Sequence, residues 1–201
     1  VTPSEVKQFF NKIPKDSLPY FSTEVQVGQL VMKPEPGAEQ LGKVERQLLE
    51  IRGKILRGTE TFENMARRYS EDPGSGSRGG QLPFYKRGEL APEFEESAMT
   101  MEVGELSMPV KSDFGYHLIE LQERRGNTFR SRHILIIPKP SADDINVAEN
   151  KLDSIRNLIL DSLTTFRVAA KEFSADKETA SNGGFYTGPD GSVRVSVEQL
   201  D

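Results

Sequence analysis

The sequence predicts an α+β fold in which a small antiparallel sheet is surrounded by helices, present once as a complete unit and again as a truncated copy. Three observations carry this prediction: segments of alternating apolar residues, amphipathic helical segments between them, and residues that recur 104 positions later. We expect an N-terminal helix and linker at 1–24, a complete domain at 25–125 and a C-terminally truncated second domain at 126–201.

The chain opens with a helical signal. Thr2, Pro3 and Glu5 form a capping-box pattern with proline in the first turn, and apolar residues follow on one face. This pattern predicts a short helix over 2–12. Two prolines then predict an extended connector over 13–19.

The first unit changes its hydrophobic period along the chain. Alternation predicts strands, and apolar residues spaced by three and four predict helices. The expected elements are, in order, a strand from Val25, helices over 41–55 and 62–69, a Gly/Ser-rich loop over 70–80, a short helix from Pro92, and strands over 106–111 and 116–122.

The repeat extends without a gap over most of the second unit. A helical period cannot also align prolines, an acid and a Gly-Gly pair, so we infer a duplication. The aligned pairs include Gln29 with His133, Asp72 with Asp176, and Gly79-Gly80 with Gly183-Gly184. The copy lacks a last helix and hairpin, and we expect its unpaired edges to leave 128–201 poorly ordered or completed by a neighbouring chain.

Composition excludes several functions. A formal net charge of -5 without a basic cluster argues against nucleic acid and anionic membrane surfaces as partners. The absence of Cys excludes disulfides and thiolate nucleophiles, and two His exclude a His-rich metal site. No apolar stretch approaches the ~20 residues needed for membrane insertion. Because the chain starts at Val1, we expect a processed or excised piece, with any signal sequence outside it.

An ordered series of motifs follows the second predicted helix. They are Ser70-Glu71-Asp72-Pro73, Arg78-Gly79-Gly80-Gln81-Leu82, Pro92-Glu93-Phe94-Glu95 and Ser112-Asp113-Phe114-Gly115-Tyr116-His117. With them, residues 26–123 resemble the parvulin family of peptidyl-prolyl cis/trans isomerases, which implies an FKBP-like fold. Tandem modules behind a helix further resemble the periplasmic SurA-type folding factors. That resemblance implies a periplasmic location and makes 2–12 the end of an upstream chaperone segment.

The resemblance also implies a site. Rotation about a prolyl amide faces a barrier of ~18–20 kcal/mol and needs neither a covalent step nor a cofactor. The partners implied are unfolded or extended polypeptides with Xaa-Pro bonds, and the incomplete second domain offers a route to self-association. The implied residues are Asp72 near the amide carbonyl, a central pair of His117 and Gln29 supported by Ser112, a proline pocket of Leu82, Leu90 and Phe94, and His133 and Asp176 in the second copy.

The residues themselves leave alternatives open. His117 shares a strand face with Ile119 and Leu121, where a lone His is as often a satisfied core residue as a catalyst. Asp72 before a proline can simply initiate a turn. Gln29 stands where the family usually has a second His, and it can hydrogen-bond but not titrate. The leading function is therefore a prolyl isomerase and folding chaperone module. The alternatives are a catalytically impaired peptide-binding module and an architectural spacer.

Overall fold

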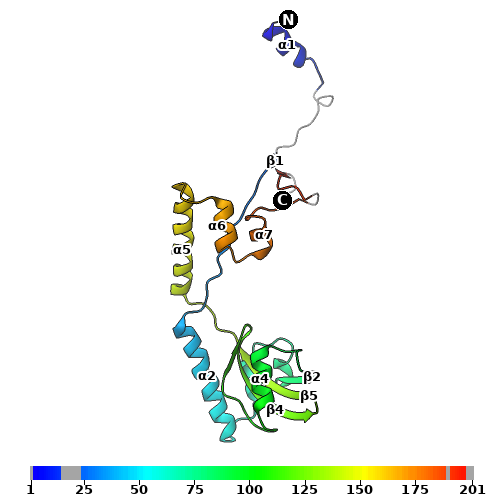
Figure 1. Ribbon diagram of the computed structural model, residues 1–201, viewed down its shortest axis with the longest axis vertical. Coiled ribbons are helices and arrows are strands. Elements are labelled where there is room, and N and C mark those ends of the chain that lie inside the picture. Colours follow the sequence, from blue (N-terminus) through cyan, green and yellow to red (C-terminus); the bar gives the residue numbers. More distant parts are fainter. Residues whose placement is uncertain (1, 15–23, 189–190, 198–201) are drawn as a thin grey trace. The chain divides into compact units, whose positions relative to one another are not determined.

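The computed structural model describes residues 2–14, 24–188 and 191–197 (Figure 1). The chain divides into two compact units. We call Pro34–Ala148 the sheet unit, and we call Val1–Lys33 together with Glu149–Asp201 the split unit.

The sheet unit contains a four-stranded antiparallel sheet, which confirms the predicted α+β class. Its spatial order is β2-β5-β4-β3, so β5 and β4 occupy the centre. The strands are β2 (Gln81–Lys86), β3 (Val110–Ser112), β4 (Gly115–Arg125) and β5 (Thr128–Ile136).

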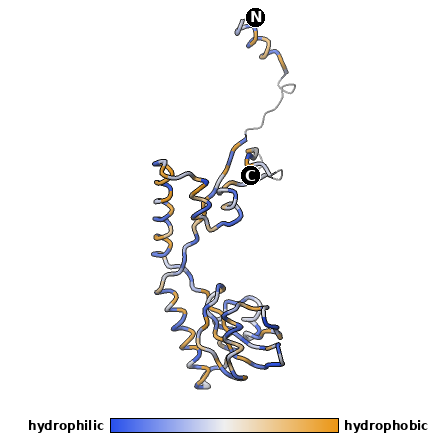
Figure 2. Tube along the Cα trace, viewed as in Figure 1, coloured by the Kyte–Doolittle hydropathy of each residue, from blue (hydrophilic) through white to orange (hydrophobic). Residues whose placement is uncertain are grey.

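Helices cover both faces of this sheet. The 3-10 turn η2 (Gly76–Arg78) lies in the loop that precedes β2. The covering helices are α2 (Ala38–Leu56), α3 (Phe62–Tyr69) and α4 (Pro92–Thr100). Apolar residues recur about once per turn along α2, which Figure 2 shows as alternating bands of colour.

Successive residues of β4 point to opposite faces, and this alternation creates two hydrophobic cores. Tyr116 and Leu118 pack in the core that α2 and α3 complete. Ile119 and Leu121 pack with Phe94 of α4 in the other core. The prediction that His117 shares the face of Ile119 and Leu121 is therefore confirmed, and His117 faces α4.

Two residues, Gly126 and Asn127, connect β4 to β5. The strands pair from the first residue after this turn, with Arg125 opposite Thr128. Gly126 has φ 55°, in the left-handed region that a tight hairpin turn requires. Because a two-residue loop closes at little entropic cost, β5 pairs with β4 more readily than a strand about a hundred residues away would.

In its described residues the split unit combines helices with two short paired strands. Its N-terminal helix confirms the prediction for 2–12, with Thr2 and Glu5 forming the expected capping box. Residues 15–23, which hold most of the predicted connector, lie outside the described residues. The elements are α1 (Pro3–Phe10), β1 (Glu24–Val25), α5 (Ala142–Leu160, from residue 149 onward), α6 (Phe166–Phe173), α7 (Lys177–Ser181) and β6 (Val195–Ser196).

Of the strand predicted from Val25, only Val25 itself lies in a regular strand, and it belongs to the split unit. β1 pairs with β6, and an isolated bridge joins Gly28 to Phe185. The Gln29 N–H donates to the Gly184 carbonyl at 2.8 Å. The compact units therefore differ from the predicted domains at 25–125 and 126–201, since β5 lies in the sheet unit and β1 lies in the split unit.

This arrangement corrects the expectation that all of 128–201 is poorly ordered or completed by another chain. Residues Thr128–Ile136 form a central strand of the sheet unit. The short β4–β5 connection is the physical reason.

Within the described ranges, no helix is both long enough and apolar enough to cross a membrane.

Candidate functional site

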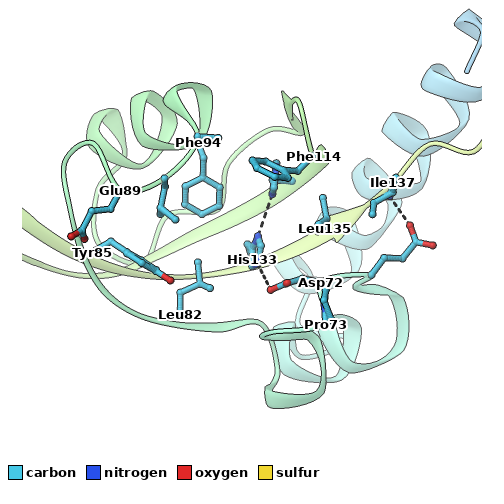
Figure 3. A pocket seen from close by; sticks show the side chains of 14 residues that line it. Asp72, Pro73, Leu82, Tyr85, Glu89, Phe94, Phe114, His133, Leu135 and Ile137 are labelled. Carbon is cyan, nitrogen blue, oxygen red and sulfur yellow. Dashed lines mark hydrogen bonds and ion pairs between the residues drawn. The ribbon is translucent and has the colours of Figure 1, made fainter. Parts of the chain in front are cut away.

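A pocket of about 650 Å³ opens on the α4 side of the sheet unit (Figure 3). Its apolar walls come from β2, from α4 and from the loop between them. The apolar lining includes Leu82, Tyr85, Leu90 and Phe94. All three residues predicted for a proline pocket, Leu82, Leu90 and Phe94, thus line one cavity.

Two histidines from neighbouring strands form the polar floor of the pocket. His117 of β4 and His133 of β5 are 4% and 7% exposed, and their Nδ1 atoms lie 3.2 Å apart. The rings stack at an interplanar angle of 13°, with centroids 5.4 Å apart. Phe94 presents an edge-to-face contact to each ring, which fixes the orientation of the pair.

Hydrogen-bond partners at both ends of the pair assign its protons. The Asp72 carboxylate can only accept, so His133 Nε2–H donates to it at 3.0 Å. In neutral His133, Nδ1 must then accept, and His117 Nδ1–H is its donor. His117 Nε2 is left to accept the Ser112 hydroxyl proton at 2.7 Å. The Phe114 N–H in turn donates to the Ser112 Oγ at 3.1 Å.

The site therefore holds one directed chain of hydrogen bonds, from Ser112 through His117 and His133 to Asp72. Every member comes from a different segment: β3, β4, β5 and the loop after α3. The chain satisfies two buried imidazoles that would otherwise be costly to bury.

Asp72 is the fixed negative end of this chain. Burial alone would raise its pKa, but hydrogen bonds from Ser75 and His133 and from the Gly74 N–H lower that pKa to about 2. Ser75 is fully buried in the turn before η2 and donates its hydroxyl to the carboxylate. Asp72 is consequently ionised throughout the physiological pH range.

The two histidines are neutral in the same range. Burial lowers the pKa of His117 to about 4, with a further contribution from neighbouring His133. Burial also lowers the pKa of His133, although the bond to Asp72 partly offsets the effect. The floor of the pocket thus presents polar groups without a positive charge.

Backbone contacts place β5 against the loop that carries Asp72. Gly80 has φ +79°, and its carbonyl accepts the His133 N–H at 2.9 Å. A Cβ on Gly80 would lie 2.2 Å from the His133 carbonyl oxygen. The Gly79-Gly80 pair therefore serves the close approach between this loop and the histidine strand.

Glu95 of α4 organises the loop on the apolar side of the pocket. Glu95 as a residue is 8% exposed. Its carboxylate accepts hydrogen bonds from the N–H groups of Gly88, Glu89 and Leu90 at 2.8 to 3.0 Å. Burial opposes ionisation, but these three bonds lower the pKa of Glu95. This one side chain thus caps three successive N–H groups of the loop that carries Leu90 into the pocket.

The structure brings most of the predicted site together, with one exchange. Asp72, Ser112 and His117 lie in the hydrogen-bonded chain, but Gln29 does not. The prediction that Gln29 faces His117 is wrong, as is the assignment of His133 to a second, separate site. His133 occupies the position expected for Gln29 because β5, and not the strand from residue 25, pairs with β4.

Gln29 lies in the split unit, next to the predicted Asp176. Its Nε2 donates to Asp176 Oδ2 at 2.6 Å, while Thr179 donates to the same oxygen at 2.7 Å. His133 and Ser75 make the corresponding contacts with Asp72 in the sheet unit. The split unit thus reproduces the acid end of the hydrogen-bonded chain with an amide in place of the imidazole.

The sequence contained one signal that His133, and not Gln29, pairs with His117. Gly126-Asn127 between two alternating segments is typical of a two-residue hairpin. A hairpin there commits the strand with His133 to the first unit. Sequence reasoning also missed Ser75 and Tyr85, which belong to no motif, and it missed the role of Glu95, which ends a recognised motif but whose partners are set by the folded loop.

The pocket has an apolar lining that fits a small apolar ring against Phe94 and Leu82, above a floor whose histidine N–H groups are already paired. In general, a site that binds the twisted form of an amide more tightly than the planar form accelerates its rotation without a covalent bond to any side chain. Across the described residues, no group of three or more His, Asp or Glu could hold a metal ion.

Comparison with known families gives two consecutive matches. Residues 30–123 and 133–199 each match the PPIC-type PPIASE domain, a rotamase family. "Foldase protein PrsA 4" of Bacillus cereus is 40% identical over 111 residues, which are 55% of this chain and 36% of the relative. "Chaperone SurA" of Salmonella typhimurium is 33% identical over 172 residues, which are 81% of this chain and 40% of the relative.

A solved structure of the peptidylprolyl isomerase PrsA from Bacillus cereus overlaps 91% of this chain and 59% of its own, at 27% identity and a TM-score of 0.38. The chain spans 36% and 40% of the length of the two curated relatives named above.

Proposed function

Because the chain belongs to the PPIC-type peptidyl-prolyl isomerase (rotamase) domain family, we propose that its sheet unit catalyses cis/trans isomerisation of Xaa-Pro bonds in unfolded or extended polypeptides. The observation that carries the proposal is the directed hydrogen-bonded chain from Ser112 to Asp72 at the floor of an apolar pocket.

Each part of the pocket has a task in this reaction. The proline ring packs against Phe94, Leu82 and Leu90, which fixes one side of the amide. The neutral pair of His117 and His133 lies beneath the bond and replaces water with fixed polar groups. Rotation removes the amide resonance that sets the ~18–20 kcal/mol barrier, so a site that prefers the twisted amide accelerates the exchange.

Asp72 and Ser112 act through the histidines. Asp72 accepts from His133 and so fixes its tautomer, which in turn fixes that of His117, while Ser112 donates to the remaining nitrogen of His117. Neither histidine has to transfer a proton to substrate, which agrees with their lowered pKa values. The contribution of the pair is orientation and polarity.

For the whole parent protein we propose a role as an extracytoplasmic folding factor, periplasmic or at the outer cell surface. The names of the relatives, a foldase and a chaperone, support the folding role. Unfolded client polypeptides would then be the partners. The duplication, and self-association through the second repeat, stay predictions.

Magnetisation-exchange NMR on a short Ala-Pro peptide tests the isomerase proposal. We expect the 201-residue chain to raise the cis/trans exchange rate, and Phe94→Ala to remove most of that increase. Phe9→Ala is the matched control, because Phe9 lies on α1 and is 70% exposed. A chain that binds the peptide but leaves its exchange rate unchanged would refute catalysis by this unit.

A second candidate, peptide binding without turnover, is favoured for the split unit. Gln29 and Asp176 reproduce the acid end of the site there, and an amide cannot change tautomer as imidazole does. Amide chemical shifts of residues 175–186 would report such binding. Peptide-induced shifts confined to the sheet unit would count against it.

A further inference from the structure

All charged side chains that line the pocket of the sheet unit are carboxylates. Glu71, Asp72 and Glu89 contribute to its lining, whereas no Lys or Arg does. The two lining histidines are neutral at pH 7, for the reasons given above. A ligand in the pocket therefore meets negative charge that nothing in the lining balances.

Hydrogen bonds hold each carboxylate in place. Glu89 accepts the Lys86 N–H at 2.7 Å, and Glu71 accepts the Ile137 N–H at 2.6 Å. Asp72 is held by Ser75 and His133. A charge fixed in this way loses little side-chain entropy when an opposite charge binds.

Nearby cations do not cancel this field. Lys139 pairs with Glu71 at 2.7 Å, so Glu71 is the one lining carboxylate with a cationic partner within the described part of the chain. Lys86 and Arg87 line a different depression, together with Met99. Among the described residues, Glu89 and Asp72 have no ion pair with any Lys or Arg.

The two uncompensated carboxylates lie on opposite sides of the apolar part of the pocket. In Figure 3, Glu89 lies beyond Tyr85 at one end, and Asp72 lies beside His133 toward the other. An extended segment whose proline ring sits near Leu82 and Phe94 therefore passes one of these acids on each side.

We propose that this pocket selects proline segments that carry Lys or Arg within two residues of the proline, and that it disfavours segments with Asp or Glu there. The inference rests on the proposed function, because it assumes that the pocket receives proline. It specifies which charge the preferred substrate carries next to proline. Glu89, an exposed residue at the edge of the pocket, is the residue that sets this preference.

The expected discrimination is modest because the rim is solvated. One unit-charge contact near 4 Å in water supplies about a fivefold preference. We expect a Lys-flanked peptide to bind about fivefold more tightly than its Gln-flanked counterpart at low salt. At 1 M salt, where the Debye length is about 3 Å, the ratio should fall below twofold.

The experiment compares three peptides that differ only in Lys, Gln or Glu on either side of Ala-Pro, using the full 201-residue chain. NMR titration gives the affinity, and magnetisation exchange in the same samples gives the isomerisation rate. Glu89→Gln should erase about half or more of the Lys-over-Glu preference, and Glu89→Lys should reverse the order. Glu50→Lys is the control, since it changes the net charge equally from an exposed position of α2 outside the pocket.

The outcomes separate the two proposals. Charge-ranked binding without faster exchange would leave the selectivity standing and overturn the isomerase function. Faster exchange with equal affinity for the three peptides would support the isomerase function and overturn the charge selectivity. If Glu50→Lys shifts the ranking as much as Glu89→Lys, the preference comes from net charge and the assignment to Glu89 is wrong. Absence of both binding and exchange would overturn both.

Discussion

Exchanging the residues at positions 29 and 133 tests whether the site is assembled as the structure has it. His133→Gln replaces the imidazole next to His117 with the residue that position 29 carries. Gln29→His changes only the split unit, where Gln29 contacts Asp176. We expect His133→Gln to slow prolyl isomerisation and Gln29→His to leave it within twofold of wild type.

The magnitude follows from the contacts that change. A glutamine at 133 can still donate to Asp72, as Gln29 does to Asp176 at 2.6 Å. It cannot keep the ring contacts with Phe94 and His117, at centroid distances of 5.6 and 5.4 Å, that hold the Nδ1 atoms together. A misplaced buried hydrogen bond costs about 1–3 kcal/mol. If the whole cost is felt in the transition state, the rate falls by about 5- to 150-fold.

The assay is magnetisation exchange on an Ala-Pro peptide with the full chain, together with urea unfolding to separate loss of fold from loss of turnover. The opposite pairing, in which the strand from residue 25 enters the sheet, makes the reverse prediction. Gln29→His would then raise the rate and His133→Gln would be silent. That result would refute the strand assignment on which the site depends.

Three further perturbations test separate parts of the site. As the pH falls from 6.5 to 4, the unfolded chain binds a proton at His117 that the folded chain, with a pKa of about 4, does not. Unfolding free energy should therefore be flat above pH 6.5 and fall by up to about 3 kcal/mol by pH 4, and His117→Gln should flatten this slope in urea titrations. Gly80→Ala should destabilise the folded chain more than Gly88→Ala does, as measured by thermal unfolding. Both glycines have positive φ, but only a Cβ at Gly80 would clash with the His133 carbonyl oxygen. Gly88→Ala should cost only the left-handed strain of about 1–2 kcal/mol, and equal losses would contradict the close approach. Glu95→Ala should weaken peptide binding severalfold, because it removes the acceptor of the loop N–H groups. Glu95→Gln should have an intermediate effect. Unchanged peptide affinity in both variants would show that the loop keeps its conformation without Glu95.

Local patterns were enough for most elements and for most of the site. Period and capping residues predicted α1, α2, α3 and α4, because these signals act within one or two turns. The ordered motifs predicted that Asp72, His117 and Phe94 belong together. β2 was not predicted, since Gln81–Lys86 lacks a clean alternation and its pairing with β5 is irregular.

Sequence periodicity was sufficient to predict the α+β class that the structure confirms, whereas the duplication and the assignment of the site stay predictions. Only the tertiary structure decided which strand completes which site. Both strands fit the same place in hydrophobic pattern, so periodicity cannot choose between Gln29 and His133. The choice depends on chain connectivity, because the Gly126-Asn127 turn lets β5 pair with β4 at little loop-closure cost. That pairing puts a second histidine, and not a glutamine, beside His117.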